Sequence, residues 1–426
     1  MTDVLPTGER RQLAPPALET GAMGWIRKNL FSSWGNGITT VVLIVAVAWF
    51  LSGFLNWALF TAVFTAPNGQ ACRGHGACWA LIHEKYRFIF FGSFPYAQHW
   101  RPLLAIAAML AMLISSADRR MWNMRLVWIW AGGSFVTFLL MFGVLSFPIS
   151  LFLVIAAVAG GMGLATRHVV AEPVELNAWR ALTAIGIVGL VLRIAGVMPA
   201  WSLTIAAFDY VETGLWGGLP VTMILATYGL LFAFPYGVLL ALGRRSKLPL
   251  IKGLCVGFIE LIRGVPLISL LIMASVMLPL FLPQGTTIDK FLRALVAVSL
   301  FAGAYIAEII RGGLQSLPKG QFEAADAMAL SYPQKTILII LPQALRVVIP
   351  PLINTFIGFF KDTSLVLIIG IFDFLNTANQ SLVDPNWAGF PAEVYIFAAF
   401  VYFCFCFSMS RYSKYLEVEL NKGTRR

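Results

Sequence analysis

Three groups of charged and polar side chains inside otherwise apolar stretches could do chemistry. Glu260 and Arg263 are three residues apart, and so are Glu308 and Arg311, so that each pair shares one face of a helix. The third group is a run of four polar residues in a Phe-, Ile- and Leu-rich stretch: Lys361, Asp362, Thr363 and Ser364. Because uncompensated charge in hydrocarbon is costly, such groups either brace neighbouring helices or line a wet path for a polar solute.

The two acid–base pairs and the polar run suggest different roles. We interpret Glu260 and Arg263 as a structural pair at a membrane boundary. Glu308 and Arg311 suit bracing and a solute path equally well. The polar run must place at least one side chain in a cavity, because four polar groups in succession cannot all face lipid. The candidates for a solute path are therefore Glu308, Arg311, Lys361, Asp362, Thr363 and Ser364.

The sequence offers no catalytic or nucleotide-binding group. All four histidines, at positions 75, 83, 99 and 168, fall outside the apolar runs, so a Ser–His site within a membrane would have no base. No Gly-Lys pair occurs, which excludes the phosphate-binding loop of an ATPase. His75 lies between Cys72 and Cys78, but too few further ligands are nearby for a metal site. We therefore expect no enzyme activity, no bound cofactor and no metal.

The composition predicts a membrane protein. Of 426 residues, 59% are hydrophobic and only 12% are charged, about half the charged fraction typical of a soluble domain. Apolar runs long enough to cross a bilayer recur along the whole length. The net charge of +11 could suggest nucleic acid, but Lys and Arg gather in short connections between the apolar runs, as they do in cytoplasmic loops. We therefore expect no nucleic-acid partner.

We predict an all-α polytopic bundle of about ten membrane helices, or eight if the hairpin at residues 127–165 does not span. Basic connections alternate with connections that lack Lys and Arg, which places both termini in the cytoplasm. The expected spans lie near residues 38–64, 102–116, 127–145, 149–165, 181–206, 218–242, 254–282, 291–310, 344–371 and 394–410.

A polar segment between two long apolar runs carries a spaced motif. It contains Glu323-Ala324-Ala325, then Ala329, and after nine residues Ile339-x-Leu341-Pro342. This spacing resembles the EAA signature of permeases in bacterial ATP-binding-cassette (ABC) importers, with Ala329 in place of the usual Gly. The resemblance implies a cytosolic coupling segment near residues 313–343 that docks in a groove of the ATPase subunit. Since glycine turns readily at positive φ and alanine does not, we expect the bend here to be gentler or displaced.

Further blocks carry a resemblance along nearly the whole of residues 214–426. They include Trp216-Gly217-Gly218-Leu219-Pro220, Glu260-Leu261-Ile262-Arg263-Gly264-Val265-Pro266, Ala304-Tyr305-Ile306-Ala307-Glu308 and Phe360-Lys361-Asp362-Thr363-Ser364. This region resembles the polar amino-acid permease family of ABC importers, with a type I permease core. Residues 1–213 then form an extension with extra membrane helices and a periplasmic loop near residues 66–100. With this extension the chain resembles the longer permease subunit of general L-amino-acid importers.

The resemblance implies a function and a set of partners. It implies import of polar or diverse L-amino acids from periplasm to cytoplasm across the bacterial inner membrane. The expected partners are a second, different permease subunit, an ATPase dimer that binds ATP and Mg, a periplasmic amino-acid-binding protein and the bilayer. Asp362 or Glu308 would then meet the substrate ammonium, and Lys361 or Arg311 its carboxylate. A secondary transporter or a channel for small polar solutes is the alternative, although neither needs the Glu323 motif.

Two cysteines in the expected periplasmic loop form a candidate disulfide. Cys72 and Cys78 flank a short Gly-containing segment, and the periplasm is oxidising. A small disulfide-closed turn is our preferred interpretation, with free thiols as the alternative.

Overall fold

The computed structural model describes residues 21–143, 156–157, 173–194, 208–283 and 288–421. The chain forms two compact units, Met1–Ala80 and Leu81–Arg426, which divide within helix α3 (Trp79–Phe91). A functional boundary between residues 213 and 214 stays a prediction.

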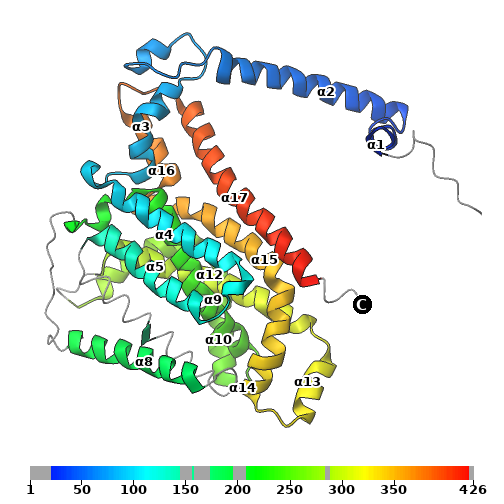
Figure 1. Cartoon of the computed structure of the whole chain (residues 1–426), viewed down its shortest axis with the longest axis vertical. Helices are drawn as coiled ribbons and strands as arrows, with labels where there is room; N and C mark the ends of the chain where they lie inside the picture. Colours follow the sequence, from blue (N-terminus) through cyan, green and yellow to red (C-terminus); the bar gives the residue numbers. More distant parts are fainter. Residues whose placement is uncertain (1–20, 144–155, 158–172, 195–207, 284–287, 422–426) are drawn as a thin grey trace, which may run out of the picture. The chain divides into compact units, whose positions relative to one another are not determined.

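The first unit contains α1 (Gly21–Asn29), α2 (Trp34–Leu55), a π-helical turn at Asn56–Phe60 and a 3₁₀ turn at Gly69–Cys72 (Figure 1). The side chain of Ser33 caps α2 by accepting a hydrogen bond from the amide of Asn36 at 3.2 Å. Within this unit α2 buries none of its residues, although it is strongly apolar. A helix that is apolar all round and unburied fits a lipid environment.

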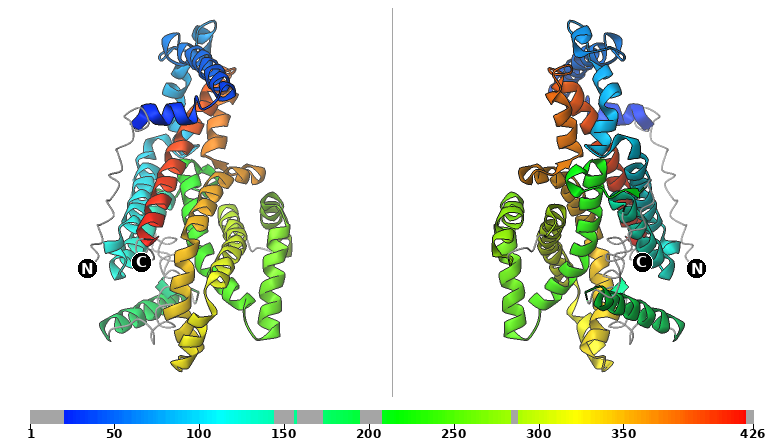
Figure 2. Two further views of the ribbon diagram at one scale, coloured as in Figure 1. Left: turned by 90° about the vertical axis from the view of Figure 1, so that its right-hand side faces the viewer. Right: turned by 90° about the vertical axis from the view of Figure 1, so that its left-hand side faces the viewer.

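The second unit is a bundle of helices around α9 and α12 (Figures 1 and 2). These two helices pack closely, since a Cβ on Gly303 of α12 would come within 2.7 Å of the Tyr236 ring on α9. After α3, the described part of this unit includes the helices α4 (Trp100–Ala117), α5 (Met124–Phe142), α8 (Pro173–Ile194), α9 (Leu219–Arg244), α10 (Pro249–Gly264), α11 (Leu267–Ile272), α12 (Lys290–Ser316), α13 (Lys319–Ala327), α14 (Tyr332–Gln334), α15 (Leu341–Asp362), α16 (Phe374–Gln380) and α17 (Pro391–Asn421).

A short parallel pairing ties the start of α9 to the start of α16. Strand β1 (Gly217–Gly218) lies in register with β2 (Phe372–Asp373), and Gly217 faces Phe372. The amide of Gly218 also donates to Thr377 Oγ1 of α16 at 3.0 Å. The extension region takes part in the same unit, because α4 packs against both α5 and α9.

The all-α polytopic architecture is confirmed. Among the described residues, seven helices are long and apolar enough to cross a membrane, or eight if one bent pair counts as a span. The seven are Trp34–Phe60, Tyr96–Ala117, Met124–Phe142, Leu219–Arg244, Lys290–Ser316, Tyr332–Ile369 and Pro391–Glu419. Of the ten spans expected, the one near residues 149–165 lies almost entirely outside the described residues, and the one near 181–206 lies partly outside them.

Two parts of the expected topology contain more local structure than their sequence patterns indicated. The span expected near residues 254–282 is broken by a bend of 105° between α10 and the helical stretch Leu267–Phe281. Pro266 explains the break, because the residue before a proline disfavours helical geometry, and Val265 is extended with φ −108° and ψ 133°. The segment near residues 66–100, expected to be a loop, contains α3 and a 3₁₀ turn at Tyr96–Gln98 as well as the turn in the first unit.

Candidate functional site

Helix α13 carries the predicted coupling motif and packs against the segment Lys335–Ile340 that leads into α15. It lies at the opposite end of the second unit from α16 (Figure 1). Its N-terminus follows Pro318, whose φ of −59° suits the entry to a helix. Gln343 Nε2 of α15 donates to Gln321 Oε1 of α13 at 3.0 Å. Lys335 forms an ion pair with Asp326 and so joins the segment after α13 to its last turn.

Helix α13 is exposed along most of its surface and buries one side. Glu323 and Ala324 are exposed, whereas Ala325 is 1% exposed and packs against its own chain. Ala325 occupies the side of the helix that anchors α13 to the rest of the chain, and its part in coupling stays a prediction. Phe322 is half-buried, and the Arg245 guanidinium lies 5.2 Å from the centre of its ring. Glu323 and Ala324 remain available to a partner.

Ala329 adopts the backbone conformation that the usual glycine would favour. Its φ is +52°, and it is the one non-glycine residue with positive φ among the described residues. The amide of Leu330 donates to Ala325 O at 3.4 Å, and the amide of Ala329 donates to Asp326 O at 3.0 Å. These two bonds form a Schellman ending, which satisfies the last carbonyls of α13. The expectation of a gentler or displaced bend was wrong, because these hydrogen bonds hold the left-handed turn in place.

The second half of the motif leads into the next membrane span. Ile339 lies in a π-helical turn, Lys335–Ile340, which continues directly into α15. Leu341 and Pro342 are the first two residues of α15. The motif therefore spans α13 and the start of α15.

Glu308 is the centre of a charge network that joins three helices. Its Oε1 accepts from Arg244 Nη1 of α9 at 2.7 Å, and its Oε2 accepts from Arg311 Nη2 at 2.8 Å. Arg263 Nη1 of α10 lies 3.6 Å from Oε2. The Glu308 side chain is 13% exposed, so its charge is largely removed from solvent and is compensated by guanidinium groups. This geometry favours bracing over binding of a substrate ammonium by Glu308.

The expected pairing of Glu260 with Arg263 was wrong. Glu260 Oε1 instead accepts from Arg244 Nη1 at 2.9 Å, while Arg263 turns toward Glu308. Arg263 also lies over the ring of Tyr305, 5.5 Å from its centre. The i, i+3 spacing placed both residues on one face, but Arg244 from another helix supplies the closer partner for Glu260.

The polar run at the end of α15 is divided between the surface and the interior. Lys361 and Asp362 are exposed, whereas Thr363 is buried and donates to Phe360 O at 2.9 Å. The carbonyl of Ser364 accepts from Asn376 Nδ2 at 2.8 Å. The structure therefore does not gather these four residues into one site.

A buried acid that was not predicted from the sequence lies beside this run. Asp373 is fully buried and caps α16, accepting from the amide of Asn376 at 3.0 Å and from Tyr402 Oη at 2.9 Å. Burial raises the pKa of the Asp373 carboxyl above its ordinary value, and hydrogen bonds from Asn376 and Tyr402 oppose that shift. The absence of Lys and Arg from residues 373–392 indicated only an outer connection, since burial here depends on α17, which follows later in the chain.

His99 lies within a candidate span, contrary to expectation, but its ring serves a structural role. Arg87 Nε donates to His99 Nδ1 at 3.3 Å, which leaves Nε2 to donate to Phe94 O at 2.8 Å. Both ring nitrogens are thus engaged, and the ring is available for neither base catalysis nor metal binding. Among the described residues, no group of three or more His, Cys, Asp or Glu side chains is placed to hold a metal.

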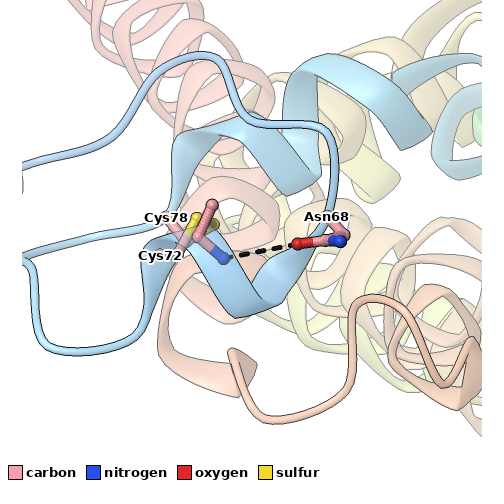
Figure 3. The surroundings of a disulfide bond; sticks show 4 residues. Asn68, Cys72 and Cys78 are labelled. Carbon is pink, nitrogen blue, oxygen red and sulfur yellow. Dashed lines mark hydrogen bonds between the residues drawn. A yellow bond between two sulfur atoms is a disulfide. The ribbon is translucent and has the colours of Figure 1, made fainter.

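A disulfide closes the turn in the first unit. Cys72 and Cys78 are bonded, with their Cα atoms 5.6 Å apart, and both are buried. Asn68 Oδ1 accepts from the amide of Ala71 at 3.3 Å and caps the 3₁₀ turn that contains Cys72 (Figure 3). The amide of Val63 donates to Ala77 O at 2.8 Å, so the chain that precedes the disulfide loop is bonded to the chain at its end.

Comparison with known proteins identifies the class to which this chain belongs. Residues 233–422 match the family described as "Binding-protein-dependent transport system inner membrane component". The chain is 43% identical over 405 residues to the inner membrane amino-acid ABC transporter permease protein YhdY of Escherichia coli K12, covering 94% of each chain. The chain therefore belongs to the family of binding-protein-dependent transport system inner membrane components. It is a multi-pass inner membrane transport component and not an enzyme.

Two further relatives differ in how much of this chain they match. The glutamate/glutamine/aspartate/asparagine transport system permease protein BztC of Rhodobacter capsulatus is 38% identical, with 97% of this chain and 98% of that protein covered. The probable glutamine ABC transporter permease protein GlnP of Bacillus subtilis is 34% identical over 92% of its length but only 48% of this chain. Similarity to shorter permeases thus extends over about half of the chain.

Proposed function

We propose that this chain is a permease subunit of an ABC importer for polar L-amino acids, driven by a separate ATPase subunit. The observation that carries the proposal is α13, which is anchored at both ends and leaves Glu323 and Ala324 exposed. An exposed short helix of this kind suits binding in a groove of a partner. The names of the two full-length relatives, which specify amino acids, support the substrate class.

The proposal includes an orientation and partners. Helix α13 and the basic end of α9 lie in the cytoplasm with both termini, and α16 lies toward the periplasm. The partners are an ATPase dimer that binds ATP and Mg, a periplasmic amino-acid-binding protein and a second permease subunit, with which this chain forms a heterodimer. Closure of the ATPase dimer on ATP moves α13, and this movement biases the bundle between outward-open and inward-open states.

The proposal also assigns a substrate path. Lys361 and Asp362 are exposed side chains near the end of α15, and they are the candidates that contact the amino acid. Glu308 and Arg311 brace the bundle, because each already has a charged partner within the chain. A substrate with both an ammonium and a carboxylate needs polar partners of both signs along its path.

The test of the coupling role is Glu323→Lys. Glu323 is the middle residue of α13 and is exposed, so reversal of its charge changes the surface that α13 offers to a partner. We expect this variant to reach the membrane but to lose ATPase docking and amino-acid uptake. Glu417→Lys is the matched control, since it reverses an exposed charge on α17. Full uptake of labelled amino acids by Glu323→Lys would overturn the coupling assignment.

A further inference from the structure

Two adjacent arginines end helix α9, and they reach different neighbours. Arg244 bonds to Glu308 of α12 and Glu260 of α10. Arg245 Nη1 donates to the carbonyl of Leu314 at 3.1 Å, and its guanidinium carbon lies 5.2 Å from the centre of the Phe322 ring. The end of α9 is therefore joined to two neighbouring helices and to the coupling helix.

The contact between Arg245 and Leu314 lies at the terminus of α12. Leu314 is in the last turn of α12, where carbonyl groups have no partner within the helix. A guanidinium there satisfies a carbonyl and also interacts favourably with the negative end of the helix dipole. Arg245 is exposed, so its hydrogen bond to Leu314 O can break and re-form when the segment after α12 moves.

The contact between Arg245 and Phe322 joins α9 to α13 directly. Phe322 immediately precedes Glu323, the exposed residue of the coupling motif. A flat guanidinium stacks on an aromatic ring, whereas a lysine ammonium offers no planar surface. A displacement of α13 therefore moves a ring on which the last turn of α9 rests.

We infer that Arg245 is a positioning residue that transmits movement of the coupling helix α13 to α9 and α12. This inference rests on the proposed function and assigns a regulatory contact within it. Arg244, the preceding residue, carries the same displacement into the Glu308 network. That network lies deeper in the bundle, because Glu308 is about 12 Å along the helix axis from the last residue of α12.

A purely structural role for Arg245 predicts a different result from a transmitting role. Loss of a structural contact lowers assembly, ATP hydrolysis and uptake together. Loss of transmission leaves assembly and ATP hydrolysis in place but lowers the amount of amino acid moved for each ATP hydrolysed. The ratio of uptake to ATP hydrolysis is therefore the decisive quantity.

The experiment uses the full complex with its ATPase, second permease and binding protein, reconstituted in liposomes. ATP hydrolysis and uptake of labelled L-glutamate and L-glutamine are measured for Arg245→Ala, Arg245→Lys and Phe322→Leu. Lys247→Ala is the matched control, since it removes an exposed positive charge from the same connection. We expect uptake per ATP to fall about fivefold or more in all three variants and to stay unchanged in the control. The double variant Arg245→Ala with Phe322→Leu should be no worse than either single change.

Two results would overturn the inference. One is an uptake-to-ATP ratio for Arg245→Ala equal to that of Lys247→Ala. The other is a parallel fall in assembly, hydrolysis and uptake. Glu323→Lys in the same preparation separates the two proposals. If that variant is inactive while Arg245→Ala behaves like the control, only the transmission role fails. If Glu323→Lys retains uptake, the coupling role proposed for α13 fails, and the transmission role fails with it.

Discussion

Ala329→Gly should stabilise the coupling segment. Ala329 has φ of +52° at the end of α13, a left-handed conformation that its Cβ disfavours. The residue is exposed, so the substitution removes a methyl group without leaving a cavity. The two hydrogen bonds of the Schellman ending use only backbone atoms, and they survive the change.

The size of the stabilisation by Ala329→Gly follows from two opposing free-energy contributions. The left-handed conformation costs an L-residue about 1–2 kcal/mol, and glycine is relieved of this cost. Glycine also has more freedom in the unfolded segment, which offsets about 0.4–1 kcal/mol of the gain. The net effect is a stabilisation of about 0.5–1 kcal/mol, which lowers the equilibrium constant for local opening about two- to fivefold.

Hydrogen exchange of the peptide that covers Lys319–Leu330 measures this effect in the purified complex. We expect its slowest amides to exchange about two- to fivefold more slowly in Ala329→Gly. Ala327→Gly is the matched control with the opposite sign, because Ala327 is exposed and has helical geometry, where glycine costs about 0.5–1 kcal/mol. Faster exchange in Ala329→Gly, or equal shifts in the two variants, would show that the left-handed turn is not strained.

Three further outcomes are expected. A thiol-reactive mass tag applied to intact cells should label Cys72 and Cys78 only after reduction; labelling without reductant would indicate free thiols. A hydrogen bond from Lys85 holds the pKa of Asp384 below its usual range, so Asp384→Asn should destabilise the protein at neutral pH. The variant should therefore unfold at a lower temperature than the parent protein at neutral pH, and this difference should fade as the pH falls through and below about 3.9. A difference in unfolding temperature that persists at lower pH would contradict the role of the Lys85–Asp384 pair. Asp362→Asn should alter selectivity among competing L-amino acids and leave assembly intact, whereas uniform loss would indicate bracing.

The coupling motif was predictable because its information is local. Pro318, the small residues of α13 and the position between two apolar runs together define a short exposed helix. The sequence could not show how the helix ends at Ala329, since propensity disfavours the observed φ and only the hydrogen bonds of the folded segment select it. Spacing likewise placed Glu260 and Arg263 on one face but could not reveal that Arg244 approaches from α9.

The interior polar groups were harder to predict than the membrane helices. Hydropathy identifies long apolar segments because the bilayer requires them. The burial of Asp373 depends on Tyr402, which lies 29 residues away on α17, and no local pattern encodes that contact. The break at Pro266 did have a local signal, since proline restricts the preceding residue, but the hydropathy of the segment obscured it.

Energy dependence of uptake tests the central claim most directly. The complete complex is reconstituted in liposomes with the binding protein outside and ATP either enclosed or omitted, while ion gradients are collapsed. We predict that labelled L-glutamate or L-glutamine accumulates only when ATP is enclosed, and that Glu323→Lys abolishes this accumulation. Uptake that follows an imposed ion gradient without ATP would contradict the account and indicate a secondary transporter or a channel.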